Sequence, residues 1–216
     1  MEKRPFLLID VMKSMKSVLL VAVVLWVLVP PACATTKYFD EPDFLAVIAP
    51  GYYLEDFTGW TYGDPLSGEP DWDAPGANGF GWHAYAPQGL WSNDSSLSTT
   101  DALDTLLITF TGNPVTAVAG VFASTDFYGN PLPQDVVVGL NDGTTVTLKT
   151  SGFAGFTSST PFAWLSVDGV DSPSYNWPQL DHFFVGQAVP EPSGLLALAA
   201  GLPALAGLAI RRRHCA

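Results

Sequence analysis

The chain has 216 residues, enough for one or two domains, and its nine basic and 21 acidic residues give a formal net charge of −12. Between Thr35 and Glu191 only Lys37 and Lys149 are basic and 19 residues are acidic, a formal charge of −17 that excludes nucleic acid as a partner, because phosphate binding depends on Lys and Arg. A hydrophobic content of 48% and an aromatic content of 12% exclude a disordered chain. The acidic charge leaves neutral polysaccharides and divalent cations as compatible ligands.

The first 34 residues have the organisation of a secretory signal peptide. Lys13 and Lys16 form a positive region, residues 18–29 form an apolar run, and Ala32-Cys33-Ala34 supplies the small residues of a cleavage site. The run is too short to span a bilayer comfortably, which favours a cleaved signal over a permanent helix. We therefore expect residues 1–34 to be removed and the mature chain to begin at Thr35, with a lipoprotein modified at the cysteine as the alternative.

Residues 35–188 carry the pattern of an all-β domain. Short apolar or alternating runs are separated by Gly, Pro, Asn and Asp, without sustained helical periodicity. The clearest hairpin spans residues 136–148, where Asn141-Asp142-Gly143 supplies the turn and Val146 and Leu148 alternate with threonines. The strands that we expect are residues 106–110, 115–123, 135–140, 144–150, 162–167 and 180–185.

Ten aromatic residues crowd the segment 52–91, among many glycines, prolines and carboxylates. We expect most of these rings to fill the core, because aromatic side chains dominate core burial. The alternative is that some of them stack on sugar rings. Trp72 is flanked by Asp71 and Asp73, which make full burial expensive, so we expect its indole to lie at the surface. Trp72 and Trp60 are therefore the candidate glycan-binding residues.

The same two aspartates are a candidate metal site. Ca²⁺ takes six to eight oxygen ligands, and Asp71 and Asp73 supply carboxylates two positions apart. The alternative is that both are solvated loop carboxylates. We expect no other cofactor.

The residues of 35–188 indicate no catalytic machinery. His83 and His182 are the histidines of this stretch, which has no cysteine, and it contains no Gly-x-Ser-x-Gly, His-Glu-x-x-His or phosphate-binding glycine loop. We expect no catalytic residue, and interpret His83 as structural. A secreted glycan-acting hydrolase remains the alternative, because a glycosidase needs only two suitably spaced carboxylates.

The C-terminus has three successive parts. Residues 189–193 read Val-Pro-Glu-Pro-Ser, residues 194–210 are uncharged and apolar, and three arginines open the basic tail 211–216. As a helix the apolar part rises about 25 Å, close to the lower limit for a membrane span. The arginines would be held on the cytoplasmic side of the inner membrane, so we expect residues 35–188 to be exported.

This order of motif, apolar helix and arginine cluster resembles the PEP-CTERM sorting signal. The resemblance covers residues 189–216 and implies an exosortase as partner, with delivery to the cell surface or the extracellular polysaccharide matrix. It implies that the exosortase recognises Pro190, Glu191 and Pro192. The helix and the basic tail, which contains Arg211, Arg212 and Arg213, would hold this chain in place as the substrate of the exosortase. An ordinary single-span anchor is the alternative.

The order of the expected strands adds a second resemblance. The strand-like segment 117–122, the hairpin after it, and the segment 180–186 that runs into the tail resemble the jelly-roll-like β-sandwich ectodomains that precede PEP-CTERM tails. The resemblance implies a jelly-roll-like β-sandwich with a structural, adhesive or glycan-contacting role.

We predict that changing Arg211, Arg212 and Arg213 together to Glu stops correct sorting. Positively charged residues retain a tail on the cytoplasmic side of the membrane, and acidic residues do not. The matched control changes the same three residues to Lys, which keeps the positive charge and should sort normally. Surface protein is measured by quantitative blotting of fractionated cells. Normal surface amounts of the Glu variant would contradict the prediction.

Overall fold

The computed structural model describes residues 34–59, 69–93, 95–170 and 176–190. The chain divides into two compact units, Met1–Ala34 and Thr35–Ala216, and every element below belongs to the second. The expected signal peptide, the apolar helix and the basic tail lie outside the described residues. Among the residues that the structure describes, no helix is long and apolar enough to cross a membrane.

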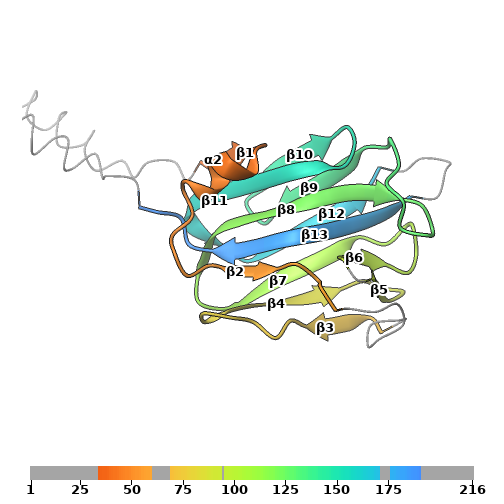
Figure 1. The fold of residues 1–216 in the computed structure, drawn as a ribbon, viewed down its shortest axis with the longest axis horizontal. Helices are drawn as coiled ribbons and strands as arrows, with labels where there is room; N and C mark the ends of the chain where they lie inside the picture. The colour runs from red at the N-terminus through yellow and green to blue at the C-terminus, as the bar shows by residue number, and fades with distance from the viewer. Residues whose placement is uncertain (1–33, 60–68, 94, 171–175, 191–216) are drawn as a thin grey trace, which may run out of the picture. The chain divides into compact units, whose positions relative to one another are not determined.

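The described fold is all-β, with two antiparallel sheets (Figure 1). The seven-stranded sheet has, in order, β1 (Thr36–Tyr38), β11 (Gly152–Phe162), β8 (Val115–Thr125), β13 (Trp177–Gly186), β6 (Ser96–Thr99) and β5 (Leu90–Asn93). Off this path, the short strand β2 (Tyr53–Glu55) also pairs with β13. The six-stranded sheet has, in order, β10 (Thr145–Leu148), β9 (Val136–Leu140), β12 (Trp164–Gly169), β7 (Leu106–Gly112), β4 (Phe80–Tyr85) and β3 (Asp71–Asp73).

One core joins the two sheets. Successive side chains of a strand point to opposite faces, so alternate residues of each strand reach the same apolar cluster. Phe122 and Phe156 enter it from the seven-stranded sheet, and Trp82, Ile108 and Leu165 enter it from the six-stranded sheet. This arrangement is consistent with a β-sandwich.

A second apolar cluster lies on the outer face of the seven-stranded sheet. The short helix α2 (Glu41–Leu45) places Phe44 against Ala119 and Phe184, and all three side chains are buried. A Cβ at Gly155 would lie 2.7 Å from the Phe44 ring, so the absence of a side chain there lets the helix approach. This end of β13 is therefore buried on both faces.

The six strands expected from the sequence are all present, and the predicted hairpin is the β9–β10 pair. Its turn closes through hydrogen bonds from Leu140 N to Thr144 O (2.9 Å) and from Gly143 N to Leu140 O (3.0 Å). Val146 points into the core while Thr145 and Thr147 are exposed, as the alternation predicted. Phe162 differs from the expectation, because it ends β11 instead of opening β12.

Two glycines with positive φ provide a test of backbone strain. A Cβ at Gly143 (φ +85°) would meet only open space, whereas a Cβ at Gly112 (φ +80°) would lie 2.2 Å from Gly79 O. We expect Gly143→Ala to lower the free energy of unfolding by about 1 kcal/mol, the conformational cost alone. Gly112→Ala should cost at least about 2 kcal/mol more, because the contact forces neighbouring backbone to shift. Urea unfolding of both variants measures the difference, and equal losses would contradict the prediction.

Candidate functional site

Trp72 lies on the edge strand β3, between two exposed aspartates. Asp71 and Asp73 point outward, so the intervening indole points toward the core. It is half-buried and meets Trp82 in an edge-on contact, with ring centroids 5.3 Å apart. The expected surface position of this indole followed from its charged neighbours, but neighbouring residues of a strand face opposite sides. A glycan role for Trp72 stays a prediction.

Asp73 lies opposite His83 on the outer face of the β3–β4 pair. Its Oδ1 lies 2.9 Å from Nδ1 of His83, while the Asp73 side chain remains 85% exposed. Because β3 is an edge strand, these outward carboxylates also discourage pairing with another chain. Within the described ranges no group of three or more His, Cys, Asp and Glu residues could hold a metal ion, and calcium binding by Asp71 and Asp73 stays a prediction.

The remaining predicted site residues lie at or beyond the limits of the described chain. Trp60 lies outside the described residues, as do Glu191, Pro192 and the three arginines. Pro190 is the last residue described. Val189 just before it is held to the domain, because its N–H donates to Val47 O at 2.7 Å. Pro190, the first residue of the Pro-Glu-Pro sequence, therefore directly follows a residue that is hydrogen-bonded to the β domain.

A hollow of about 100 Å³ lies on the seven-stranded sheet, where β8 ends and β13 begins. We call it the aromatic hollow, and it is lined by Trp91, Ser98, Thr99, Thr100, Thr125, Asp126, Phe127 and Trp177. Phe127 and Trp177 meet edge-on with ring centroids 5.8 Å apart, and Phe127 is 64% exposed. Aromatic walls with a few polar groups are typical of small-molecule sites.

Strand pairing brings these side chains together from distant parts of the sequence. Trp91 lies opposite Ser98 in the β5–β6 pair, and Trp177 lies opposite Thr125 in the β8–β13 pair. The indole N–H of Trp177 donates to Thr100 O at 3.2 Å, which ties β13 to the segment after β6. The walls of the hollow thus come from four strands and two loops.

Asp126 is the carboxylate that lines the aromatic hollow, and its oxygens accept hydrogen bonds from the turn that follows it. Its Oδ1 accepts hydrogen bonds from the backbone N–H groups of Tyr128 (2.8 Å) and Asn130 (2.9 Å), and both oxygens contact the Asn130 amide. Hydrogen bonds from the side chain and backbone of Asn130, with that from Tyr128, hold the pKa of Asp126 below its usual value. The carboxylate is therefore ionised at neutral pH and braces the turn that carries Phe127.

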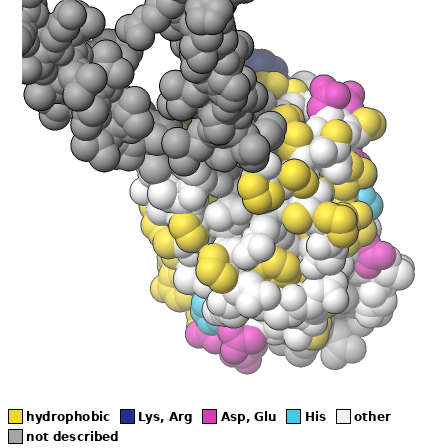
Figure 2. All heavy atoms as spheres, turned by 90° about the vertical axis from the view of Figure 1, so that its left-hand side faces the viewer, with side chains coloured by type: hydrophobic (Ala, Val, Ile, Leu, Met, Phe, Trp, Pro, Cys, Tyr) yellow, Lys and Arg dark blue, Asp and Glu magenta, His cyan; other side chains and the backbone are white. Residues whose placement is uncertain are grey.

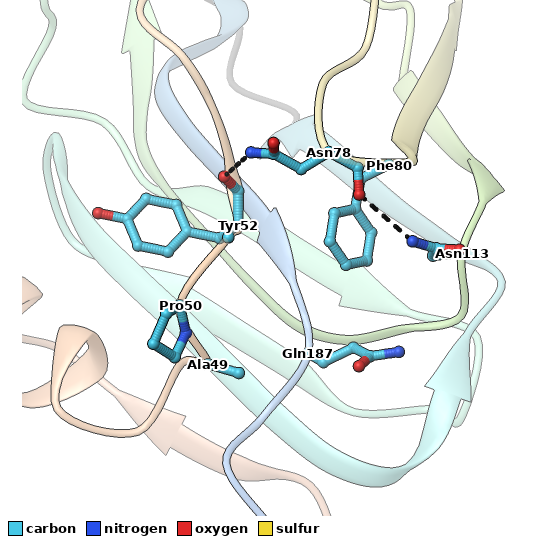
Figure 3. Close-up of a pocket in the computed structure, with 8 residues that line it drawn as sticks. Ala49, Pro50, Tyr52, Asn78, Phe80, Asn113 and Gln187 are labelled. Carbon is cyan, nitrogen blue, oxygen red and sulfur yellow. Dashed lines mark hydrogen bonds between the residues drawn. The ribbon is translucent and has the colours of Figure 1, made fainter.

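A larger pocket, of about 360 Å³, lies at the opposite end of β8 and β13 (Figure 3). We call it the amide pocket, and it is lined by Ala49, Pro50, Gly51, Tyr52, Asn78, Phe80, Asn113 and Gln187, none of them charged. In the view of Figure 3 the Phe80 ring lies between Tyr52 and Asn113, above Gln187. Figure 2 faces this end of the domain and shows hydrophobic and uncharged groups over most of the described surface in view, with Asp and Glu gathered at the margins.

The rim of the amide pocket is held by amide hydrogen bonds. Asn78 Nδ2 donates to Tyr52 O at 3.1 Å, and Asn113 Nδ2 donates to Asn78 O at 3.3 Å. Gln187 Nε2 donates to Pro114 O at 3.3 Å. These bonds join the segment before β2, the β3–β4 loop, the β7–β8 turn and the end of β13, which are far apart in the sequence.

Glu55 is a buried carboxylate that contributes to neither pocket. It accepts hydrogen bonds from the Tyr53 hydroxyl and, at 3.0 Å, from the backbone N–H of Phe57. Burial and the neighbouring Glu55 carboxylate raise the pKa of Tyr53 far above its usual value. Glu55 therefore stabilises the fold at β2.

The sequence matches no protein family model, and its comparison with curated proteins and with solved structures gives no match either. The two pockets are the features from which a function can be argued. Sequence reasoning named neither of them, although Trp91 was among the ten clustered aromatic residues.

We predict that Trp72→Ala lowers the free energy of unfolding by about 2 kcal/mol, because it removes the packing against Trp82. The matched control is Tyr85→Ala on the neighbouring strand, where the ring is 40% exposed and lies on the outer face. It should cost less than about 1 kcal/mol. Thermal and urea unfolding measure both. A Trp72→Ala variant of normal stability that binds polysaccharide more weakly would instead support the surface role first expected.

Proposed function

We propose that this chain is an exported bacterial envelope protein whose β domain binds a neutral glycan at the cell surface or in the extracellular matrix. Export is supported by the signal-like residues 1–34, and sorting by an exosortase at the inner membrane is supported by the likeness of residues 189–216 to a PEP-CTERM tail. The two antiparallel sheets support a jelly-roll-like sandwich as the exported domain.

The aromatic hollow is the observation that carries the glycan proposal. Sugar rings present apolar faces that stack on aromatic side chains, and Trp91, Phe127 and Trp177 surround the hollow. The hydroxyls of the lining serine and threonines already donate to backbone carbonyls, so toward a sugar hydroxyl they can only accept. Thr100 is the one of these four that is not buried, and it is the lining hydroxyl that a sugar would reach. At about 100 Å³ the hollow is shallow and would contact one face of a sugar unit in a longer polymer.

The charge of the domain selects a neutral polymer. Residues 35–191 carry 19 carboxylates against two lysines, so an anionic polysaccharide is repelled as it approaches. Salt screens this repulsion only in part at physiological ionic strength. A neutral glycan approaches without that cost.

Binding is favoured over hydrolysis at the aromatic hollow. A glycosidase uses two carboxyl groups, and one of them must hold a proton to give to the leaving group. Asp126 is the lining carboxylate, and the hydrogen bonds that lower its pKa favour its ionised form. Assays for released reducing ends on the same polysaccharide address the hydrolase alternative, and release by the wild type above that of a buffer control would support it.

The test compares two adjacent aromatic residues. Phe127 lines the hollow, whereas Tyr128 is 80% exposed and does not line it. We expect Phe127→Ala to weaken binding to the neutral fraction of extracted matrix polysaccharide about tenfold, the loss expected for one aromatic anchor. Tyr128→Ala should stay within about twofold of the wild type. Co-sedimentation measures both affinities, and an unchanged Phe127→Ala variant would remove the hollow as the glycan site.

A further inference from the structure

We infer that the amide pocket is a second site for neutral glycan, so that one chain bridges two polysaccharide strands; the inference rests on the proposed function of the aromatic hollow. Three observations carry it: the uncharged lining of the pocket, its braced backbone, and its position at the far end of the same two strands.

The lining is neutral although the domain is strongly acidic. Asn78, Asn113 and Gln187 each present an amide, which has an acceptor oxygen and two N–H donors, one of them already given to a backbone carbonyl. Pro50 and Phe80 add apolar surface. The absence of a charged side chain from this lining leaves no group to pair with an ionic ligand. The volume of about 360 Å³ falls within the range of small-molecule sites.

The backbone around the pocket is braced by its own contacts. Asn78 has a φ of +56°, a conformation that costs energy for a residue with a Cβ and persists where the surroundings impose it, whereas Gly51 (+88°), Gly79 (+85°) and Gly112 (+80°) adopt positive φ without that cost. Asn113 N donates to Gly79 O at 2.8 Å and locks the β7–β8 turn to the β3–β4 loop. A braced site loses little entropy when it binds, which favours recognition of a flexible polymer.

The two sites are too far apart for one sugar unit to occupy both. The amide pocket includes Asn113 and Gln187, which flank the start of β8 and the end of β13. The aromatic hollow includes Thr125 and Trp177, at the other ends of the same strands. β8 has 11 residues, which places the two sites about 30 Å apart along one strand ladder. Where each site holds a separate polysaccharide strand, the two strands are cross-linked.

The experiment uses the full chain in detergent, shown to be monomeric by light scattering, with short oligosaccharides made from the neutral matrix polysaccharide. Ala49→Trp fills the amide pocket, Phe127→Ala opens the aromatic hollow, and Thr147→Trp on the exposed face of β10 is the control for added bulk. Gln187→Ala removes one amide from an exposed position and is the milder variant should Ala49→Trp fail to fold. Calorimetry counts the sites, and a sensor coated with the polysaccharide tests whether bound protein captures a second, labelled strand.

We expect two sites per chain in the wild type and in Thr147→Trp, and one site in Ala49→Trp, which does not capture the second strand. In Phe127→Ala one of the two sites should be about tenfold weaker, and Gln187→Ala should weaken the other site about tenfold. One site in the wild type, about tenfold weaker in Phe127→Ala and unaffected by Ala49→Trp and Gln187→Ala, overturns the inference and leaves the proposed function standing. No binding by the wild type overturns both. Two sites without capture of a second strand overturn the bridging.

Discussion

The antiparallel ladder between β8 and β13 is the element on which the rest of the structure depends. It runs from Trp177 opposite Thr125 to Gly186 opposite Ala117, and it lies in the interior of the seven-stranded sheet. On one face its side chains enter the core shared with the other sheet, and near the end of β13 its other face is covered by the helix that carries Phe44. Both pockets lie at its ends, so the ladder fixes the distance between them.

An irregularity in this ladder decides which aromatic residues face which cluster. The register shifts between Asp181 and Phe184, where His182 has a φ of +50° and adds one residue to the strand. Because alternate residues face the same side, this extra residue sends Phe183 into the shared core and Phe184 toward the helix. His182 itself stays half-exposed, with Nε2 3.6 Å from a carboxylate oxygen of Glu41. Regular alternation would have pointed this histidine toward the core.

The sequence predicted the regular part of the fold and little of either pocket. Most strands after residue 105 were recognisable because alternation and turn residues such as Gly143 agree there. The long strand β11 was not predicted, because Gly, Ser and Thr interrupt its apolar residues. The strands between residues 53 and 99 were missed, since closely spaced glycines, prolines and aromatic residues hide the period of two. Both pockets are assembled from segments that only strand pairing brings together, as with Trp91 and Trp177. Trp72 shows the opposite error, because the expectation considered its charged neighbours and neglected the faces of a strand.

The scarcity of lysine and arginine also bears on how readily proteases cut the domain. Trypsin-like proteases cut after basic residues, and between Thr35 and Glu191 they find only Lys37 and Lys149. Lys37 lies in β1 with its ammonium group on Thr145 O, and Lys149 pairs with Asp135 at 2.8 Å. Cleavage needs the backbone at such a site to open and enter a protease cleft, which the paired strand β1 resists at Lys37, whereas Lys149 lies in the exposed bend after β10. The composition that repels anionic polymers thus also leaves few sites for trypsin-like proteases.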